Sequence, residues 1–533
     1  MTSVCEACRL TGEDVRPDLA EVLARRAATR DEGRPDAVSK RRERGGRTAR
    51  ENVEDLVDEG SFVEYGALAI AAQRMRRPRD ELIAKTPADG LIGGTARVNS
   101  GLHGAETAVC AVLSYDYTVL AGTQGATGHR KKDRLFELIQ RMRLPAVIFC
   151  EGGGGRPGDT DYAVISALDT RAFALWGRLS GVVPRIAVVS GRCFAGNAVL
   201  AGSSDLIIAT DTIALGMGGP AMIEGGGLGT FPPDAIGPID VQSPNGVVDV
   251  RVADEPETVA VTKRLVSYFQ GPISEWTAPD PLALRNVVPE RRRRAYDVHV
   301  AVDGVADSGS VTYLREEFAQ PMVTALARIE GRAVGIIANN PMHLAGAITS
   351  DGADKAARFM QLCDAFGLPI LSLIDTPGMM VGPEAEATAL VRHCSRLFTI
   401  GASLSVPFAA VILRKAYGLG AQAMASGSMH EPLLTVGWPT AELGAMGLEG
   451  AVKLGFRREL DAIADDTERA ERLEQMVAHA HDHAKALNAA TLFEIDDVID
   501  PADTRRVVAS TFAAAGVTGS WRDRPPVRTV DNW

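Results

Sequence analysis

An internal repeat constrains the fold of this chain more than any other feature of its sequence. The segment LPAVIFCEGGGG in the first half is matched by LPILSLIDTPG in the second, and their prolines, Pro145 and Pro369, stand 224 positions apart. Further on, VPRIAVVSGR is matched by VPFAAVILRK, 223 positions later. A third match pairs Gly196 in SGRCFAG with Gly418 in LRKAYGLG, 222 positions apart. Three matches in one order at nearly one offset indicate a duplicated domain.

Each copy predicts a strand, a Gly-rich turn and a helix, and then the same three elements again. Runs such as AVIFC and AAVIL are continuously apolar, which is typical of strands buried on both faces of a sheet. Strands that alternate with helices predict an α/β fold. We expect a charged helical lead-in over residues 1–59, a first domain over 60–275, a Pro-rich and charged linker over 276–299, a second domain over 300–510 and a tail over 511–533.

Composition excludes several classes of function. With 533 residues, 46% of them hydrophobic, the chain is long enough to bury more than one core. Aromatic residues make up only 5%, and acidic residues outnumber basic ones by 68 to 57, which argues against nucleic-acid partners. The sequence shows neither a signal peptide nor a run of about 18 apolar residues, so we expect a cytoplasmic protein without membrane contact.

The seven cysteines predict no disulfide framework, because their number is odd and no export signal is seen. Cys5 and Cys8 form a CxxC pair, but a structural zinc needs four ligands and no second pair follows. Two reduced thiols are the favoured interpretation and zinc the less favoured one, so we expect no metal in this chain.

Glycine-rich turns carry the chemistry that the sequence suggests. GxSxG, HExxH and Walker motifs are all missing, which argues against a side-chain nucleophile or a catalytic metal. Backbone N–H groups in turns at helix N-termini can instead stabilise the oxyanion of an enolate. A glycine after a strand often serves only a tight turn or close packing. Such turns in both halves favour the oxyanion interpretation, since two sites suit a reaction between two carbonyl compounds.

Segments spread over nearly the whole chain match one known family. They include GRTARENVEDLVDEGSFVEYG (46–66) and WPTAELGAMGLEGAV (438–452), and the most specific are ANNPMHLAG (338–346), DTPG (375–378) and RKAYG (414–418). On these segments the sequence resembles the carboxyltransferase (β) subunits of biotin-dependent acyl-CoA carboxylases, of the acetyl- and propionyl-CoA carboxylase type. The resemblance implies tandem duplicated α/β domains of the ClpP/crotonase kind.

The resemblance also implies a reaction. In that family carboxybiotin releases CO₂, the biotin ureido anion takes the α-proton of an acyl-CoA, and the thioester enolate attacks CO₂. By match to the family turn SGGAR, the amides of Gly153, Gly154 and Gly155 would face the thioester oxygen. By match to RKAYGGAY, the amides of Leu419 and Gly420 would face the ureido oxygen.

Further site residues follow from the same match. Ala195 and Gly196 would lie on the acyl-CoA side, and Gly418 would lie beside the biotin. The substrate-sorting position of the second turn falls on Gln422, whose polar amide argues against a long apolar acyl chain.

The phosphates of CoA require cations. One set of candidates is Arg76 and Arg77 in QRMRRPRD, and the other is Lys131 and Lys132 in GHRKKDR, which opens a predicted helix. A charged run is usually a solvated face, so both interpretations stay open.

Partners are implied by what the chain lacks. It has no AMKM biotinylation motif and no ATP-grasp pattern, so separate biotin carboxylase and biotin carrier chains are expected. The resemblance further implies a homo-hexamer in which each active site lies between the first half of one chain and the second half of another. The turns EGGGGRPGD and GLGAQ depart from the family pattern, which keeps two alternatives open: an acyl-CoA decarboxylase, and a catalytically silent scaffold subunit.

Overall fold

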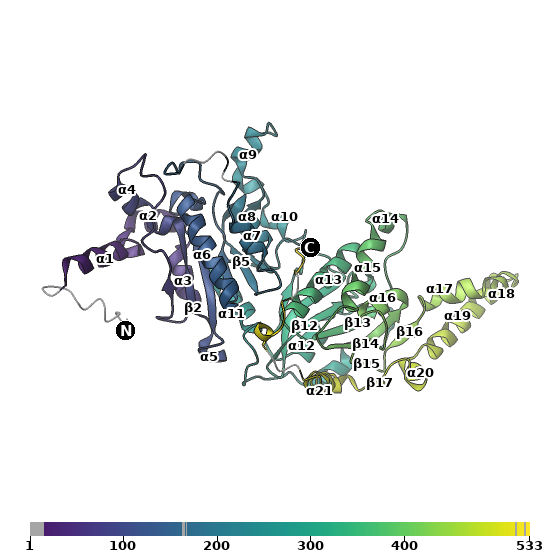
Figure 1. Ribbon diagram of the computed structural model, residues 1–533. Helices are drawn as coiled ribbons and strands as arrows, with labels where there is room; N and C mark the ends of the chain where they lie inside the picture. Colours follow the sequence, from purple (N-terminus) through teal and green to yellow (C-terminus); the bar gives the residue numbers. More distant parts are fainter. Residues whose placement is uncertain (1–14, 163–165, 167, 517–519, 527–528) are drawn as a thin grey trace. The chain divides into compact units, whose positions relative to one another are not determined.

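The computed structural model describes residues 15–162, 166, 168–516, 520–526 and 529–533 (Figure 1). The chain divides into two compact units, Met1–Val241 with Arg251–Arg264, and Gln242–Val250 with Leu265–Trp533. Within these described ranges no helix is long and apolar enough to cross a membrane.

The first unit is built on a seven-stranded sheet. The pairs β1–β2 and β2–β3 are antiparallel, and the pairs from β3 through β4 and β5 to β7 are parallel. In sheet order the strands are β1 (Val63–Glu64), β2 (Leu91–Arg97), β3 (Val109–Tyr115), β4 (Ala146–Phe149), β5 (Arg185–Val189), β7 (Leu206–Thr210) and β9 (Val250–Val252). A separate parallel pair joins β6 (Arg192–Phe194) to β8 (Ala214–Gly216).

The second unit repeats this sheet. Its strands run in the same order, again with two antiparallel pairs at one edge followed by parallel pairs. They are β10 (Thr312–Leu314), β11 (Met322–Ile329), β12 (Arg332–Asn339), β13 (Ile370–Thr376), β14 (Phe408–Tyr417), β15 (Leu434–Gly437) and β17 (Asp497–Val498), with β16 (Glu442–Gly444) paired to the end of β14. The predicted duplication and the α/β class are confirmed.

Helices connect the parallel strands. Before residue 270 they are α1 (Pro17–Ala27), α2 (Pro35–Glu43), α3 (Ala49–Leu56), α4 (Arg79–Lys85), α5 (Ser100–His103), α6 (Ala126–Met142), α7 (Ala172–Gly177), α8 (Gly196–Gly202), α9 (Pro220–Gly225), α10 (Ile239–Gln242) and α11 (Glu255–Tyr268). After it they are α12 (His299–Val305), α13 (Ser350–Ala365), α14 (Pro383–Glu386), α15 (Leu390–Gly401), α16 (Gly418–Met424), α17 (Leu448–Gly455), α18 (Arg457–Asp461), α19 (Asp466–His483), α20 (Ala486–Thr491) and α21 (Thr504–Ala514).

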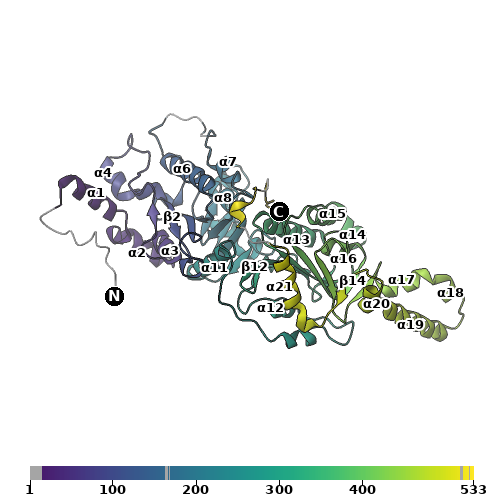
Figure 2. The same cartoon turned by 60° about the horizontal axis from the view of Figure 1, so that its bottom comes forward.

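Helices α17, α18 and α19 project from the rest of the second unit in both ribbon views (Figures 1 and 2). The crossover helices α6 and α13 lie between equivalent strands, and α13 is buried on nearly every side while α6 buries one face.

The duplication extends to single backbone conformations. Ala121 and Ala345, 224 positions apart, both have positive φ angles, of 54° and 53°. The third sequence match needs a correction by one residue. The equivalent of Gly418 (φ 58°) is Ala195 (φ 51°), not Gly196, because Ala195 is the residue that follows β6 as Gly418 follows β14.

The segment 276–299, predicted as a linker, lies within the second unit. Its apolar side chains Leu284 and Val298 are fully buried in the core of that unit, beside Val302 of α12. In the predicted lead-in, Arg50 and Asn52 of α3 are buried rather than exposed, and α3 contacts β3.

Candidate functional site

The first turn lies at the carboxyl end of β4. Gly154 has a φ of 79°, a conformation that favours glycine. The amide of Gln124 donates to the carbonyl of Gly154 at 2.6 Å, and the amide of Arg156 donates back to Gln124 at 3.0 Å. In the described part of the chain the amides of Gly153, Gly154 and Gly155 donate to no acceptor. These three N–H groups are therefore available to a ligand.

The start of α8 supplies a second arm to this turn. A Cβ atom on Gly154 would lie 2.7 Å from the Cβ of Ala195 and 3.6 Å from the amide nitrogen of Gly196. Ala195 has φ 51° and ψ −123°, a strained conformation of the kind that clusters at functional sites. Because Gly196 is the first residue of α8, its amide has no intrahelical acceptor. The sequence predicted helix N-termini after all such turns, but among the described residues between Gly155 and Ala172 (156–162, 166 and 168–171) no helix follows Gly152–Gly155.

The second unit contains the same arrangement. Gly378 of the DTPG turn has a φ of 123°, its carbonyl accepts from the amide of Ile348 at 3.1 Å, and the amide of Met380 donates back to Ile348 at 2.9 Å. A Cβ atom on Gly420 would lie 2.6 Å from the carbonyl carbon of Gly378 and 3.0 Å from the nitrogen of Met379. The first turn of α16, which holds Gly418, Leu419 and Gly420, therefore packs directly against the DTPG turn.

A buried carboxylate precedes each turn. In the second unit Asp375, which is fully buried, accepts from Nε of Arg414 at 3.0 Å and lies 3.3 Å from Nζ of Lys415. In the first unit the two oxygens of Glu151 accept from the guanidinium of Arg41 at 2.6 and 2.9 Å. Burial raises the pKa of Glu151, and the charge of Arg41 opposes that rise. Sequence analysis identified neither Arg41 nor Glu151.

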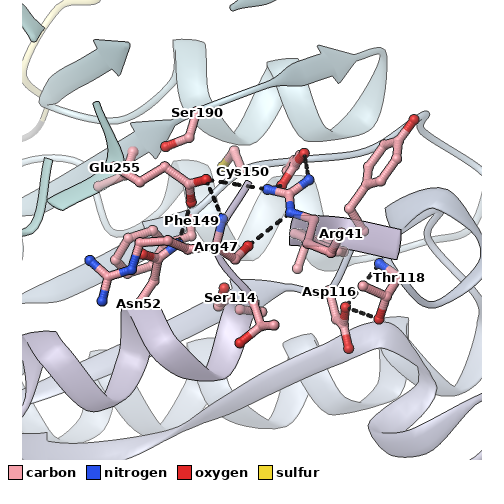
Figure 3. Close-up of a pocket in the computed structure, with 16 residues that line it drawn as sticks. Arg41, Arg47, Asn52, Ser114, Asp116, Thr118, Phe149, Cys150, Ser190 and Glu255 are labelled. Carbon is pink, nitrogen blue, oxygen red and sulfur yellow. Dashed lines mark hydrogen bonds and ion pairs between the residues drawn. The ribbon is translucent and has the colours of Figure 1, made fainter. Parts of the chain in front are cut away.

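A small cavity is lined by Glu151 together with Arg41, Asn52 and Glu255, and Figure 3 shows the last three of these. Its volume is about 20 Å³, enough for a single water molecule. There Glu255 accepts from Nδ2 of Asn52 at 2.6 Å and from the amide of Arg47 at 2.8 Å, and lies 3.6 Å from Arg41. These contacts hold α2, α3 and α11 together around the carboxylate, so the cavity supports the turn and is too small for a substrate.

A larger groove shares Arg41, Tyr117 and Thr118 with this cavity. Its volume is about 710 Å³, within the range of small-molecule sites, and it lies between α2, the end of α4 and the loop 117–121. Its exposed cations are Lys40, Arg44 and Lys85. Of these, Lys40 and Arg44 form no ion pair with any carboxylate that the structure describes, so their charges are available to an anionic ligand.

The family described as "Carboxyl transferase domain" matches residues 40–522. The chain belongs to this family. The methylmalonyl-CoA carboxyltransferase 12S subunit of Propionibacterium freudenreichii subsp. shermanii is 32% identical to it over 494 residues, which cover 89% of this chain and 90% of that protein. The predicted family and enzyme class are thereby confirmed.

Two solved structures match this carboxyl transferase closely. One is a single-chain, multi-domain long-chain acyl-CoA carboxylase, with 57% identity and a TM-score of 0.89; the match covers 93% of the present chain and 49% of that one, so our chain spans about half its length. The other is the hexameric transcarboxylase 12S, with 29% identity, a TM-score of 0.81 and coverage of 96% and 97%. The agreement supports the crotonase-like, two-domain fold.

Two of the predicted phosphate ligands are buried in this carboxyl transferase. Nζ of Lys131 donates to the carbonyls of Gly66, at 3.2 Å, and Leu91. Nζ of Lys132, 1% exposed, donates to Oε1 of Gln124 at 2.7 Å. Burial lowers the pKa of Lys131 to about 8 and that of Lys132 to about 7. Neither ammonium group reaches a surface where a CoA phosphate could bind.

Lys355 of α13 occupies the place of Lys131, 224 positions later. Its Nζ donates to the carbonyls of Arg315 and Phe318, both at 2.8 Å. Arg315 lies three residues after the start of β10, as Gly66 lies three residues after the start of β1. The two lysines therefore share one internal link, to the carbonyl of Gly66 or Arg315, while their second acceptors, Leu91 and Phe318, differ in place. We name the shared link the lysine staple.

The other predicted residues lie on the surface. Nη1 of Arg76 donates to the carbonyl of Gly158 at 3.2 Å, and Nη1 of Arg77 donates to Glu81 at 2.7 Å. Gln422 is exposed on α16. Cys5 and Cys8 lie outside the described residues, and elsewhere no cluster of three or more His, Cys, Asp or Glu side chains could hold a metal ion.

Proposed function

We propose that this carboxyl transferase moves CO₂ from carboxybiotin on a carrier protein to the α-carbon of an acyl-CoA. The duplicated turn is the observation that carries the proposal. In each unit a glycine turn lies against the first turn of a helix, and together they offer backbone N–H groups in place of nucleophilic side chains. An enolate oxygen and a ureido oxygen both need such donors when negative charge develops on them.

The first turn is assigned to the acyl-CoA. The amides of Gly153, Gly154 and Gly155, with that of Gly196, would donate to the thioester oxygen and stabilise the enolate. The larger groove would receive the CoA moiety, with its phosphates near Lys40, Arg44 and Lys85. Arg76 is a further candidate, because it is exposed and borders the same loop at Gly158.

The second turn is assigned to biotin. The amides of Leu419 and Gly420 lie in the first turn of α16, where no intrahelical acceptor exists for them. A side chain at position 420 would collide with Gly378, so the backbone itself lines this place. Such a cradle of donors fits a neutral or anionic urea oxygen. Carboxybiotin, when bound, supplies the CO₂.

Assembly follows by similarity to the transcarboxylase 12S hexamer. We propose a homo-hexamer in the cytoplasm, with each active site formed by the first unit of one chain and the second unit of another. Biotin carboxylase and the biotin carrier would be separate chains. On this proposal the purified chain gives no signal on a streptavidin blot, and a signal that survives labelling controls would contradict the division of labour.

The direct test is turnover of an acyl-CoA panel from acetyl-CoA to palmitoyl-CoA, with bicarbonate, ATP and the cognate partner chains. We expect palmitoyl-CoA to be the best substrate, because the relative with 57% identity is a long-chain acyl-CoA carboxylase. If the best substrate instead has an acyl group of three carbons or fewer, we would infer that Gln422 excludes long acyl chains. Release of CO₂ from a carboxyacyl-CoA without any biotin acceptor would indicate a decarboxylase, and no turnover at all a scaffold subunit.

A further inference from the structure

The two turns differ in what lies directly behind them. Behind the first turn are three buried polar side chains, and the duplication identifies what replaces them in the second unit. Equivalent positions are 224 residues apart before β5 and 223 residues apart after it. Gln124 and Lys132 therefore correspond to Ile348 and Ala356, and Asn197 corresponds to Gly420. The second turn thus keeps the same closing backbone hydrogen bonds without any of the three polar groups.

The three side chains of the first unit form one hydrogen-bonded chain. Nζ of Lys132 donates to Oε1 of Gln124 at 2.7 Å, and Nε2 of Gln124 donates to Oδ1 of Asn197 at 2.5 Å. Nδ2 of Asn197 then donates to the carbonyls of Glu151, at 3.0 Å, and Gly122, at 3.2 Å. Every bond points in the same direction, from the ammonium group to the peptide that begins the turn. We call these three residues the polar chain.

Lys132 is an unusual residue to bury. Its exposed fraction is 1%, and no carboxylate of the described residues pairs with it. Its other neighbours are the rings of Tyr115 and Phe173, whose centroids lie 5.7 and 5.8 Å from Nζ. A buried ammonium without an anionic partner is unfavourable, and departures of this kind from the usual rules of folding are expected where function requires them.

Gln124 connects the polar chain to both arms of the site. Its backbone amide donates to the carbonyl of Gly154, which fixes the turn. Its side-chain amide lies against α8, since a Cβ atom on Gly196 would be 3.1 Å from both Nε2 and Oε1. One side chain therefore sets the distance between the amides of the turn and the amide of Gly196. The orientation of that side chain depends on the hydrogen bonds from Lys132 and to Asn197.

We propose that Lys132, acting through Gln124 and Asn197, positions the two amide arms that hold the enolate oxygen. Lys132 is thus a positioning residue for the first site, with no counterpart in the second. The inference rests on the proposed assignment of the first turn to the acyl-CoA. It predicts an effect on the rate of the chemical step more than on the affinity for CoA, because the groove that would bind CoA lies on α2 and α4.

The experiment compares Lys132→Met with Lys355→Met in the reconstituted carboxylase. Palmitoyl-CoA and propionyl-CoA are the probes, and kcat and KM are measured for whichever the wild-type enzyme turns over faster. Both substitutions remove a buried lysine amino group, but Lys355 lies in the second unit and donates to the carbonyls of Arg315 and Phe318, outside both turns. We expect Lys132→Met to lower kcat by about 10- to 100-fold with KM changed less than threefold, and Lys355→Met to leave kcat within about twofold.

Two further variants separate positioning from simple loss of packing. Because Lys132 acts through Gln124, Lys132→Met combined with Gln124→Met should lose no more activity than the worse single variant. The triple variant Lys132→Ala, Gln124→Ile, Asn197→Gly places at these three positions the residues that the second unit has there, and circular dichroism and gel filtration check that it is folded and assembled. Its kcat should fall as in Lys132→Met.

The outcomes decide between the inference and the assignment beneath it. The inference would be overturned by a normal kcat in Lys132→Met or in the folded triple variant. It would also be overturned if the loss of kcat in the double variant equalled the product of the losses in Lys132→Met and Gln124→Met. Gly154→Val distinguishes a failure of this inference from a failure of the assignment of the first turn to the acyl-CoA. If Gly154→Val abolishes turnover while Lys132→Met does not, only the inference fails, and if Gly154→Val is fully active in the assembled enzyme, the first-turn assignment itself fails.

Discussion

In the first unit the carboxylate before the turn is held by Arg41, which comes from a helix outside the sheet, whereas in the second unit it is held by Arg414 and Lys415 on the neighbouring strand. The two turns are nevertheless closed by the same pair of backbone hydrogen bonds, with Gln124 in one unit and Ile348 in the other. The difference shows that one backbone can be supported from different directions after a duplication. Since α2 also lines the groove, the support of the first turn and the proposed CoA site share one helix.

The largest expected effect tests whether the first turn is the enolate site. Gly154→Val should lower kcat by about 10²–10³, a loss of roughly 3–4 kcal/mol of transition-state stabilisation. Gly154 has a positive φ, and a side chain there would meet Ala195 at 2.7 Å, so the amides must twist or move. Steady-state kinetics measure the effect, and gel filtration checks that the oligomer is intact. Loss of activity that merely follows dissociation would not count as a catalytic effect.

The next effect concerns stability and separates the two supports. Arg41→Gln leaves Glu151 buried without its cation and should lower the free energy of unfolding by about 3 kcal/mol at pH 8. Without Arg41 the pKa of Glu151 rises further, so the carboxyl becomes neutral as the pH falls and the deficit shrinks toward pH 5. Urea unfolding at both pH values measures this. A deficit that grows toward low pH would contradict the proposed role of Arg41.

A smaller effect tests the lysine staple. Burial lowers the pKa of Lys355 to about 7, whereas the unfolded chain keeps it near its ordinary value. Between about pH 10 and pH 7 the Lys355 amino group takes up a proton in the unfolded state only, so the free energy of unfolding of the wild type decreases as the pH falls. Lys355→Met lacks this proton uptake. Its free energy of unfolding relative to wild type should therefore rise by about 1.4 kcal/mol per pH unit as the pH is lowered from 9.5 to 7.5. A difference in the free energy of unfolding that does not change with pH would refute the lowered pKa of Lys355.

The smallest effect concerns selectivity at the second turn. Gln422→Ala should change the ratio of kcat/KM between palmitoyl-CoA and propionyl-CoA by roughly fivefold, about 1 kcal/mol, with the better substrate still turned over. Gln422 is exposed on α16 and lies beside the proposed donor amides, not among them. Equal losses for both substrates would show that Gln422 supports the turn instead of selecting the acyl group.

The sequence predicted much of this molecule because duplication is visible in the chain itself. The matches at Pro145 and Pro369 placed both turns correctly, and glycine at position 154 indicated a special backbone. Sequence analysis did not predict the burial of Lys131 and Lys132, although their spacing from apolar residues on the same helix indicates it. Lys131 lies four residues before Leu135 and Lys132 four residues before Phe136, on the face of α6 that packs inward.

Other parts of the site could not be predicted from the chain alone. Arg41 belongs to a run of charges, KRRER, in which nothing distinguishes the one arginine that reaches Glu151, 110 residues further on. The polar chain likewise depends on packing, because Gln124, Lys132 and Asn197 come from a loop and two helices. Such long-range contacts leave no periodic pattern in a single sequence.

The lysine staple bears on the ancestry of the molecule. Lys131 and Lys355 each secure the carbonyl that lies three residues after the start of the first strand of its unit, Gly66 or Arg315, and the two units are assigned to different ligands. A link shared in this way dates from before the two copies diverged, so the ancestral gene already encoded a single half with the staple in place. Two identical copies of that half would have presented two identical turns. Tandem fusion allowed the two turns to differ, so that Gln124, Lys132 and Asn197 stand behind one and Ile348, Ala356 and Gly420 behind the other, which a homodimer of identical halves could not have done.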